Sequence, residues 1–236
     1  MERDGWRRAS AEALGTAFLV AIVVGSGIAA QRLSPSDVGL QLLINATVTG
    51  AGLAALILAL GPVSGAHFNP VVTLADRILC GISSRDGAAY IAAQLVGGCV
   101  GAMVANLMFS LPAVTLSTHT RASSGLWLGE FVATFGLVIV ILGAARSGRS
   151  SVAAFAVGGY IAAAYWFTSS TSFANPAVTI ARTLTDTFSG IRPSSAPMFI
   201  LMQVAGGLTA AAVARWLFPT LAADSVVVPH DSATHR

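Results

Sequence analysis

The sequence contains no lysine and little charge of either sign. Its 236 residues include 13 cationic residues, all of them arginine, against 10 Asp and Glu. Charged residues make up 10% of the chain, whereas an ordinary soluble domain has about 25%. The positive excess is small and no basic cluster is longer than Arg7-Arg8, which excludes a nucleic-acid-binding surface. The two cysteines, Cys80 and Cys99, lie in apolar stretches, so we expect reduced packing thiols rather than a disulfide framework.

The sequence is rich in apolar residues. They make up 55% of the chain, and the mean hydropathy is +0.75, so lipid must be the solvent for much of it. A membrane-spanning helix needs about 20 apolar residues. Stretches free of Asp, Glu and Arg predict six such helices, near residues 11–30, 38–60, 87–109, 126–145, 151–168 and 195–218. Two apolar remainders, 64–75 and 171–181, are too short to cross and are expected to enter the membrane only halfway.

The distribution of arginines predicts the orientation, because positive residues stay on the cytoplasmic side. With both termini inside, nine arginines lie on that side and four outside. We therefore expect a multi-pass protein of the inner (cytoplasmic) membrane. The N-terminus imitates a signal peptide, but its apolar run exceeds the usual length of about 7–15 residues and Glu12 stands at its start. We expect one membrane domain over residues 1–221 and a disordered cytoplasmic tail over 222–236.

Three pairs of motifs recur in the same order and indicate an internal repeat. The pairs are EALGT at 12–16 with EFVAT at 130–134, NPVVT at 69–73 with NPAVT at 175–179, and QLVGG at 94–98 with QVAGG at 203–207. We place the repeats at about 6–115 and 124–220. Each repeat contains three crossings, an odd number, so the second is inverted relative to the first. Channels and transporters built in this way have their sites at the membrane midplane, where broken helices meet.

The two halfway segments predict a wet passage at that midplane. Residues 64–68 and 170–174 read as non-helical, and such backbone is tolerated at membrane depth only where protein buries it or water lines it. A short helix then begins at each Asn-Pro pair, with Asn as the cap and Pro in the first turn. Inversion brings the two helix N-termini together, each equivalent to about half a positive charge. We expect cations and protons to be repelled there, while the Asn69 and Asn175 amides donate hydrogen bonds to passing neutral oxygens.

These residues resemble the aquaporin family, the major intrinsic proteins. The resemblance runs from Trp6 to about Leu221 and rests on SGAHFNPV at 64–71, on Asn-Pro-Ala at 175–177, on Glu12 and Glu130, and on the repeat. It implies an all-α membrane protein with six transmembrane helices and two re-entrant half-helices, one pore per protomer and a homotetramer. The implied pore motif consists of Asn69, Pro70, Val71, Asn175, Pro176 and Ala177.

The resemblance also implies roles for polar residues outside that motif. Residues matching Glu12 and Glu130 hydrogen-bond the half-helix loops in the family, so we interpret both as structural braces rather than proton relays. His67 is expected at the cytoplasmic pore mouth, with pH sensing as the alternative role. Phosphate-binding, metal-binding and nucleophile motifs are lacking, and the sequence therefore predicts no enzyme, no metal site and no cofactor.

Two departures from the family pattern concern the pore. Val71 stands where the family usually has Ala, which we interpret as a small packing change. Val178 stands where most water and glycerol channels have an Arg in the outer constriction. The family spacing assigns the other constriction positions to Thr49, Ala163 and Ser172. None of these residues is bulky, which predicts a constriction that is wide, uncharged and only mildly polar.

Arg182 follows Val178 by four residues and therefore lies on the same helix face. We expect it in the outer vestibule at the pore mouth. Two alternatives remain, a reach back into the constriction and an ion pair with Asp186.

A wide pore without the Arg resembles the bacterial branch linked to arsenic resistance. The sequence thus predicts a passive channel whose partners are the lipid bilayer and small uncharged solutes, namely glycerol, urea, neutral arsenite, methylated arsenicals and water. An ordinary water-selective aquaporin is the alternative. Two hypotheses come from other classes, a proton-coupled secondary transporter that uses Glu12 or Glu130 and a structural junction protein with little flow. Downhill flux, accumulation and absence of flux distinguish the three classes.

Overall fold

The computed structural model describes residues 3–146 and 150–218. These residues form α1 (Arg3–Leu33), α2 (Val38–Ser64), α3 (Pro70–Ile78), α4 (Ser84–Met108), α5 (Ser124–Arg146), α6 (Ser150–Phe167), α7 (Pro176–Ala181) and α8 (Ala196–Leu217), with two 3-10 turns, η1 (Arg182–Leu184) and η2 (Pro193–Ser195). Within them there is no strand, and the predicted all-α class is confirmed. The predicted disordered tail at 222–236 lies outside the described residues.

The long helices correspond to the six predicted crossings. In the described ranges, α1, α2, α4, α5 and α8 are each long and apolar enough to cross a membrane. The apolar part of α6 is shorter, Val152–Phe167. All 18 residues of α6 extend over about 27 Å at 1.5 Å per residue, close to the hydrocarbon thickness of about 30 Å. Helix α1 begins at Arg3, well before its apolar run, because polar residues continue a helix beyond lipid as readily as apolar ones do.

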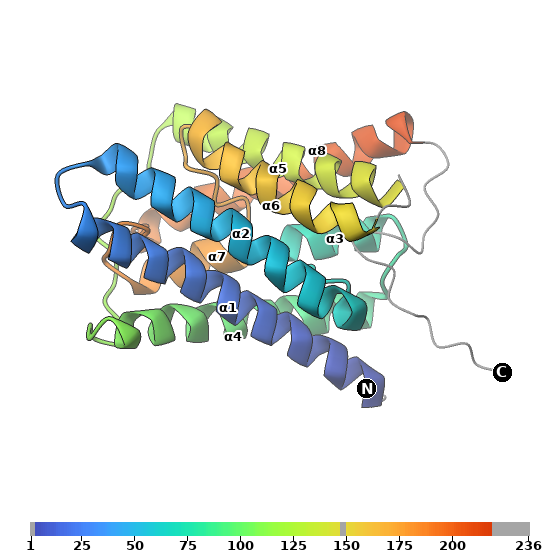
Figure 1. Ribbon diagram of the computed structural model, residues 1–236. Coiled ribbons are helices and arrows are strands. Elements are labelled where there is room, and N and C mark those ends of the chain that lie inside the picture. Colours follow the sequence, from blue (N-terminus) through green and yellow to red (C-terminus); the bar gives the residue numbers. More distant parts are fainter. Residues whose placement is uncertain (1–2, 147–149, 219–236) are drawn as a thin grey trace.

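The six long helices surround α3 and α7, which lie in the middle of the molecule (Figure 1). Helix α1 packs against α2 and α4, and α5 packs in the corresponding way against α6 and α8. The contact between α2 and α6 joins the two sets. Helix α1 begins and α8 ends at the same side of the molecule (Figure 1), as an even number of crossings requires. We call this the N-terminal side, and the side of η1 and η2 the opposite side.

Glycines let the helices of each set approach closely. A Cβ on Gly97 of α4 would lie 2.1 Å from the Ala13 carbonyl oxygen of α1, and a Cβ on Gly206 of α8 would lie 2.4 Å from the Phe131 carbonyl oxygen of α5. Only glycine fits such backbone contacts, which are typical of helix pairs in membranes. The two contacts occupy corresponding places in the two sets.

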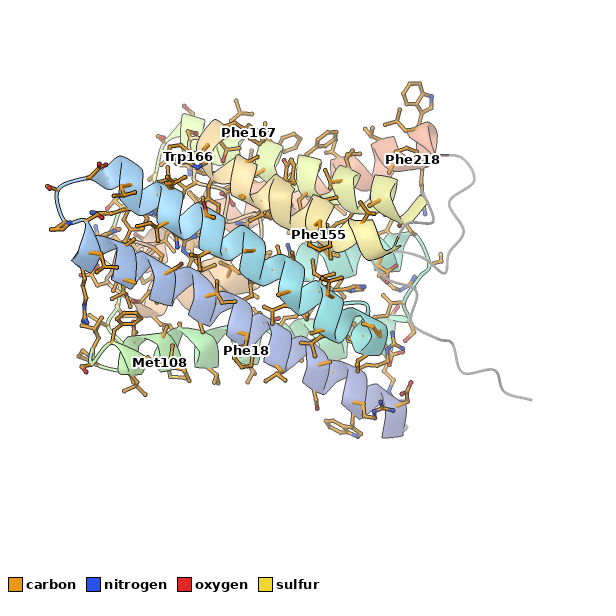
Figure 2. All side chains as sticks on the ribbon, viewed as in Figure 1. Phe18, Met108, Phe155, Trp166, Phe167 and Phe218 are labelled. Atoms are coloured by element: carbon orange, nitrogen blue, oxygen red, sulfur yellow. The ribbon has the colours of Figure 1, made fainter. Side chains whose placement is uncertain are left out.

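The outer surface of the helix bundle is apolar. Phe18 of α1, Phe155 of α6 and Phe167 of α6 are 53%, 63% and 56% exposed, and all three point away from the bundle (Figure 2). An exposed apolar surface of this extent is typical of a protein that contacts lipid or another protein there. The buried side chains, in contrast, include many polar ones, among them Glu12, Gln94, Glu130 and Gln203 at 0% exposure. This is the distribution of a multi-pass membrane protein.

Candidate pore and its constriction

Two non-helical segments enter the middle of the bundle and precede α3 and α7. Their backbone takes left-handed φ angles at several residues other than glycine, namely Ala66, Phe68, Thr171, Ser172 and Ala174. This conformation costs about 1–2 kcal/mol per residue for an L-amino acid. Each segment therefore needs stabilising contacts from the helices around it.

Glu12 of α1 supplies those contacts to the first segment. Its Oε1 accepts hydrogen bonds from the Ser64 hydroxyl at 2.6 Å and the His67 N–H at 3.0 Å. Its Oε2 accepts from the Phe68 N–H at 2.7 Å and from Gln94 Nε2 at 2.8 Å. The carboxylate is thereby fully occupied by protein donors, and it does not line the cavity described below.

Glu130 of α5 makes the corresponding contacts in the second half. Its two oxygens accept the Phe173 and Ala174 N–H groups, both at 2.9 Å, and Oε2 also accepts from Gln203 Nε2 at 2.5 Å. Glu130 is completely buried and does not line the cavity either. Both carboxylates are thus held by donors of the half-helix segments and lie away from the cavity wall, which supports their interpretation as braces.

Asn69 and Asn175 link the two half-helices at the centre. Asn69 Nδ2 donates to the Ala174 carbonyl at 2.8 Å, and Asn175 Nδ2 donates to the Phe68 carbonyl at 2.7 Å. The amide oxygens cap the helices by accepting from the first N–H groups of α3 and α7. A side-chain amide has two N–H donors, so each Asn retains one for another acceptor. Both residues line the central cavity, where a solute oxygen can accept it.

The central cavity has an empty volume of about 540 Å³, open solvent included. Its polar lining residues are Thr49, His67, Asn69, Tyr165, Ser172, Asn175 and Arg182. The remaining wall is mostly aliphatic and comes from both halves, for example from Val23 of α1, Ile57 of α2, Ile141 of α5 and Ile161 of α6. The passage thus pairs a track of hydrogen-bonding groups with an apolar wall.

Three of the four predicted constriction residues reach this cavity. Thr49 of α2, Ser172 of the segment before α7, and Val178 of α7 line it, and each is at most 4% exposed. The Ser172 hydroxyl is buried and has no hydrogen-bond partner in the protein. Short side chains at these three positions leave room for a solute between them.

Ala163, the fourth predicted position, is wrong. It lies on the exposed outer side of α6, and Ile161 and Tyr165 line the cavity instead. An error of two residues rotates a side chain by about 200° around a helix with 3.6 residues per turn, which is enough to move it to the opposite face. The Tyr165 hydroxyl lies 3.4 Å from the Thr49 hydroxyl. The constriction is therefore partly aromatic, and not built from small residues alone.

Arg182, expected at the pore mouth, lines the wall of the cavity. It is 2% exposed, its Nε donates to the Ser189 carbonyl, and its guanidinium carbon lies 3.4 Å from the centroid of the Phe173 ring. The cavity wall therefore carries a charged group one turn beyond Val178. The sequence indicates this position of Arg182 through its spacing of four residues from Val178, which puts the two side chains on one helix face.

The alternative ion pair between Arg182 and Asp186 is absent from the described part of the chain. Asp186 instead accepts hydrogen bonds from Thr118, from the N–H at 2.8 Å and from the hydroxyl at 3.0 Å. The backbone N–H bond from Thr118 lowers the pKa of Asp186, which keeps this surface carboxylate ionised.

His67 lines the cavity near α3, toward the N-terminal side. Its Nδ1 lies 3.1 Å from the Thr73 hydroxyl and its Nε2 lies 3.5 Å from the Asp76 carboxylate. The Tyr90 ring packs edge-on against it with centroids 5.3 Å apart. These contacts hold the imidazole in place beside the passage.

Val71, the other departure from the family pattern, does not line the cavity. It packs between α3 and α8 and belongs to an apolar cluster with Ala75, Leu142 and Ala211. A Cβ on Gly207 would lie 2.1 Å from Val71 Cγ1. Gly207 therefore provides the space that Val needs in place of Ala.

This packing predicts that Gly207→Ala destabilises the protein by about 1–3 kcal/mol, the usual cost of overpacking. Thermal unfolding of the detergent-solubilised protein measures the change. Gly159→Ala is the control, because a Cβ on this helical glycine of α6 has no neighbour within 4 Å. Val71→Ala combined with Gly207→Ala should restore much of the loss. Equal stability of Gly207→Ala and the wild type would contradict the packing argument.

Comparison with known proteins places this geometry among channels. The family model described as Major intrinsic protein matches residues 1–174 and 148–235. The chain is 51% identical over 216 residues to "Aquaglyceroporin AqpS" of Rhizobium meliloti (strain 1021), covering 92% of each protein. It is 31% identical over 242 residues to "Aquaporin AqpM" of Methanothermobacter thermautotrophicus, covering 89% of this chain and 97% of the relative.

A solved structure shows the same fold. The X-ray structure of the aquaglyceroporin from Plasmodium falciparum superposes with a TM-score of 0.72 at 20% identity, over 91% of this chain and 98% of that chain. The predicted arrangement of six long helices around two re-entrant half-helices is confirmed by this likeness.

Proposed function

The chain belongs to the major intrinsic protein family and is a passive membrane channel for small solutes, not an enzyme, and we propose that its pore conducts uncharged solutes larger than water. Glycerol and urea are the first candidates, with neutral arsenite and methylated arsenicals as further ones. The observation that carries this proposal is the cavity at Thr49, Ser172 and Val178, where short side chains line the passage.

The chemistry of the wall supports solutes that carry both oxygen and carbon. Asn69 and Asn175 each retain one N–H for a solute oxygen, and this donor offsets the loss of a water molecule from the solute. Aliphatic residues such as Val23 and Ile141 cover the rest of the wall and can contact the carbon side of a solute. The 51% identity to a protein named an aquaglyceroporin supports the same reading.

Membership of this family also bears on the domain organisation, the orientation in the membrane and the assembly of the chain. We infer that the repeats at 6–115 and 124–220 form one channel domain within residues 1–221, that the N-terminal side faces the cytoplasm of a cell with an inner membrane, and that four copies assemble. The excess of arginine on the N-terminal side supports the orientation. The exposed apolar surface that includes Phe18 and Phe155 supports burial in lipid and against other copies. Native mass spectrometry from detergent tests the tetramer.

Stopped-flow light scattering on proteoliposomes tests the cargo. We expect shrinkage in a glycerol or urea gradient to be followed by re-swelling at least tenfold faster than in empty liposomes. Arsenite entry is measured in parallel from the arsenic content of filtered vesicles. Asn175→Asp serves as the pore variant, because a carboxylate cannot donate the hydrogen bond to the Phe68 carbonyl; it should lower every solute flux.

The rivals give different results in the same assay. Water flux without glycerol, urea or arsenite flux would mean a water-selective channel and would overturn the proposal. Accumulation of solute against its gradient on applying a pH difference would mean a coupled carrier. Neither flux nor accumulation in correctly inserted protein would mean a junction role.

A further inference from the structure

Arg182 is an arginine enclosed in the wall of the pore. It is 2% exposed and lines the cavity together with Phe173 and Val178. It is the C-cap of α7, four residues after Val178, so it lies about 6 Å further from the centre along the helix direction. The guanidinium stacks on the Phe173 ring at 3.4 Å, which fixes the plane of the charged group beside the passage.

Two polar groups at this level of the pore have no hydrogen-bond partner in the protein. Arg182 Nε donates to the Ser189 carbonyl, but Nη1 is buried without a hydrogen-bond partner. The Ser172 hydroxyl, which also lines the cavity, is likewise buried without a partner. Buried polar groups in native proteins nearly always have partners. Two unpartnered groups on one cavity wall point to a solute oxygen as the partner that they meet.

The charge of Arg182 is not neutralised locally. Within the described ranges no carboxylate lies within ion-pair distance of it. Glu130 is the carboxylate that interacts with it electrostatically, and its oxygens already accept from Phe173, Ala174 and Gln203. The Phe173 ring, on which Arg182 stacks, also has a second guanidinium near it: that of Arg121, at 5.1 Å from the ring centroid. This level of the pore therefore carries positive charge in a narrow, largely enclosed part of the protein, where solvent screens the charge less than at the surface.

We propose that Arg182 is the selectivity cation of this pore, placed one helical turn beyond Val178, and that Arg182 and Ser172 form a subsite for the oxygen of an uncharged oxygen-bearing solute. The guanidinium excludes cations, hydronium included, and the two free donor groups bind a hydroxyl or carbonyl oxygen in transit. The inference rests on the proposed function, since it assumes that solutes pass this level. The other role open to Arg182 is to hold the residues near Ser189 in place through the Nε bond.

Proteoliposomes separate the two roles. Arg182→Met keeps an unbranched apolar stem and removes the charge and the donors, whereas Arg182→Lys keeps the charge. Arg192→Met is the control, because Arg192 is an exposed arginine in the loop at the same side of the molecule. Proton leak is followed with an enclosed pH dye, and both proton leak and glycerol flux are expressed relative to water flux in the same vesicles.

We expect Arg182→Met to raise the ratio of proton leak to water flux at least tenfold and to lower the ratio of glycerol to water flux several-fold. Arg182→Lys should retain low proton leak, and Arg192→Met should match the wild type in both ratios. Ser172→Ala removes a hydroxyl that the protein does not use, so folding is not at stake. It should lower the glycerol-to-water ratio about twofold to tenfold, the effect of one hydrogen bond worth about 0.5–1.5 kcal/mol.

Wild-type ratios in folded Arg182→Met would overturn the proposal. So would a loss of folded protein in Arg182→Met and Arg182→Lys alike, with unchanged ratios for the channels that remain, because that result assigns Arg182 to the loop near Ser189. A wild-type glycerol-to-water ratio in Ser172→Ala overturns the subsite even if Arg182→Met fails to fold. Absence of glycerol flux in the wild type is a different outcome: it refutes the proposed cargo, while the proton-leak comparison still decides the role of the charge.

Discussion

Glu130→Gln is expected to remove most of the folded protein and, with it, the solute flux. The carboxylate accepts the N–H groups of Phe173 and Ala174 and the amide of Gln203. A glutamine keeps one acceptor oxygen and places an NH2 group where the other was, so at least one buried donor faces another donor. Each buried donor left without an acceptor costs about 1–3 kcal/mol. The strained φ angles of Thr171, Ser172 and Ala174 then lose the contact that holds them.

The loss is measured as the yield of monodisperse protein in size-exclusion chromatography and as the thermal unfolding midpoint in detergent. Glu12→Gln is the matched variant, because Glu12 holds the Phe68 and His67 N–H groups in the other half; its loss should be of similar size. Asp37→Asn is the surface control, since that carboxylate caps α2 at an exposed site. Stable Glu130→Gln channels with an altered pH dependence of flux would contradict the brace and would instead favour a proton relay.

Much of the pore centre could be predicted because its signals are local and occur twice. An Asn-Pro pair after a non-helical segment dictates both a helix cap and the start of the short helix, and the structure has both at Asn69 and Asn175. Glu12 and Glu130 are conspicuous because a charged side chain in an apolar membrane helix is costly and therefore indicates a specific contact or function. Repetition of these motifs in the same order, with three crossings in each repeat, predicts an inverted second half and indicates where the two halves meet.

The wall of the constriction could not be predicted in the same way. Helix α6 is apolar on nearly every side, so its sequence gives no periodic signal for which face turns inward. Spacing alone selected Ala163, and the inward residue is Tyr165. The burial of Arg182 depends on a contact with the Ser189 carbonyl, and this contact forms only because the chain after η1 folds back onto α7. The inward face of α6 and the contact of Arg182 are determined by packing between distant segments, so the local sequence does not predict them.

Val178→Arg is expected to reduce glycerol and arsenite flux at least tenfold while reducing water flux least. Val178 is 4% exposed and lines the cavity, and Arg182 lines it one turn further along α7. A second guanidinium at position 178 would narrow the passage between Thr49 and Ser172 and add a second positive charge near the first. Solutes larger than water then lose the space they need. Assembly should be unchanged, because the new side chain points into the cavity and not toward another copy.

Charge and size in this variant are separated by Val178→Met, which adds length to the side chain without charge. If width alone limits the pore, both variants lower the glycerol-to-water flux ratio to a similar degree. If the repulsion between two guanidinium groups matters as well, Arg at 178 is driven away from Arg182 and across the passage, and its ratio falls further than that of Met. Stopped-flow measurement of water, glycerol and arsenite at matched protein density provides these ratios. Equal ratios in the wild type, Val178→Arg and Val178→Met would mean that the narrowest point lies away from Val178, and the level of Arg182 and Phe173 would then be the place to look for it.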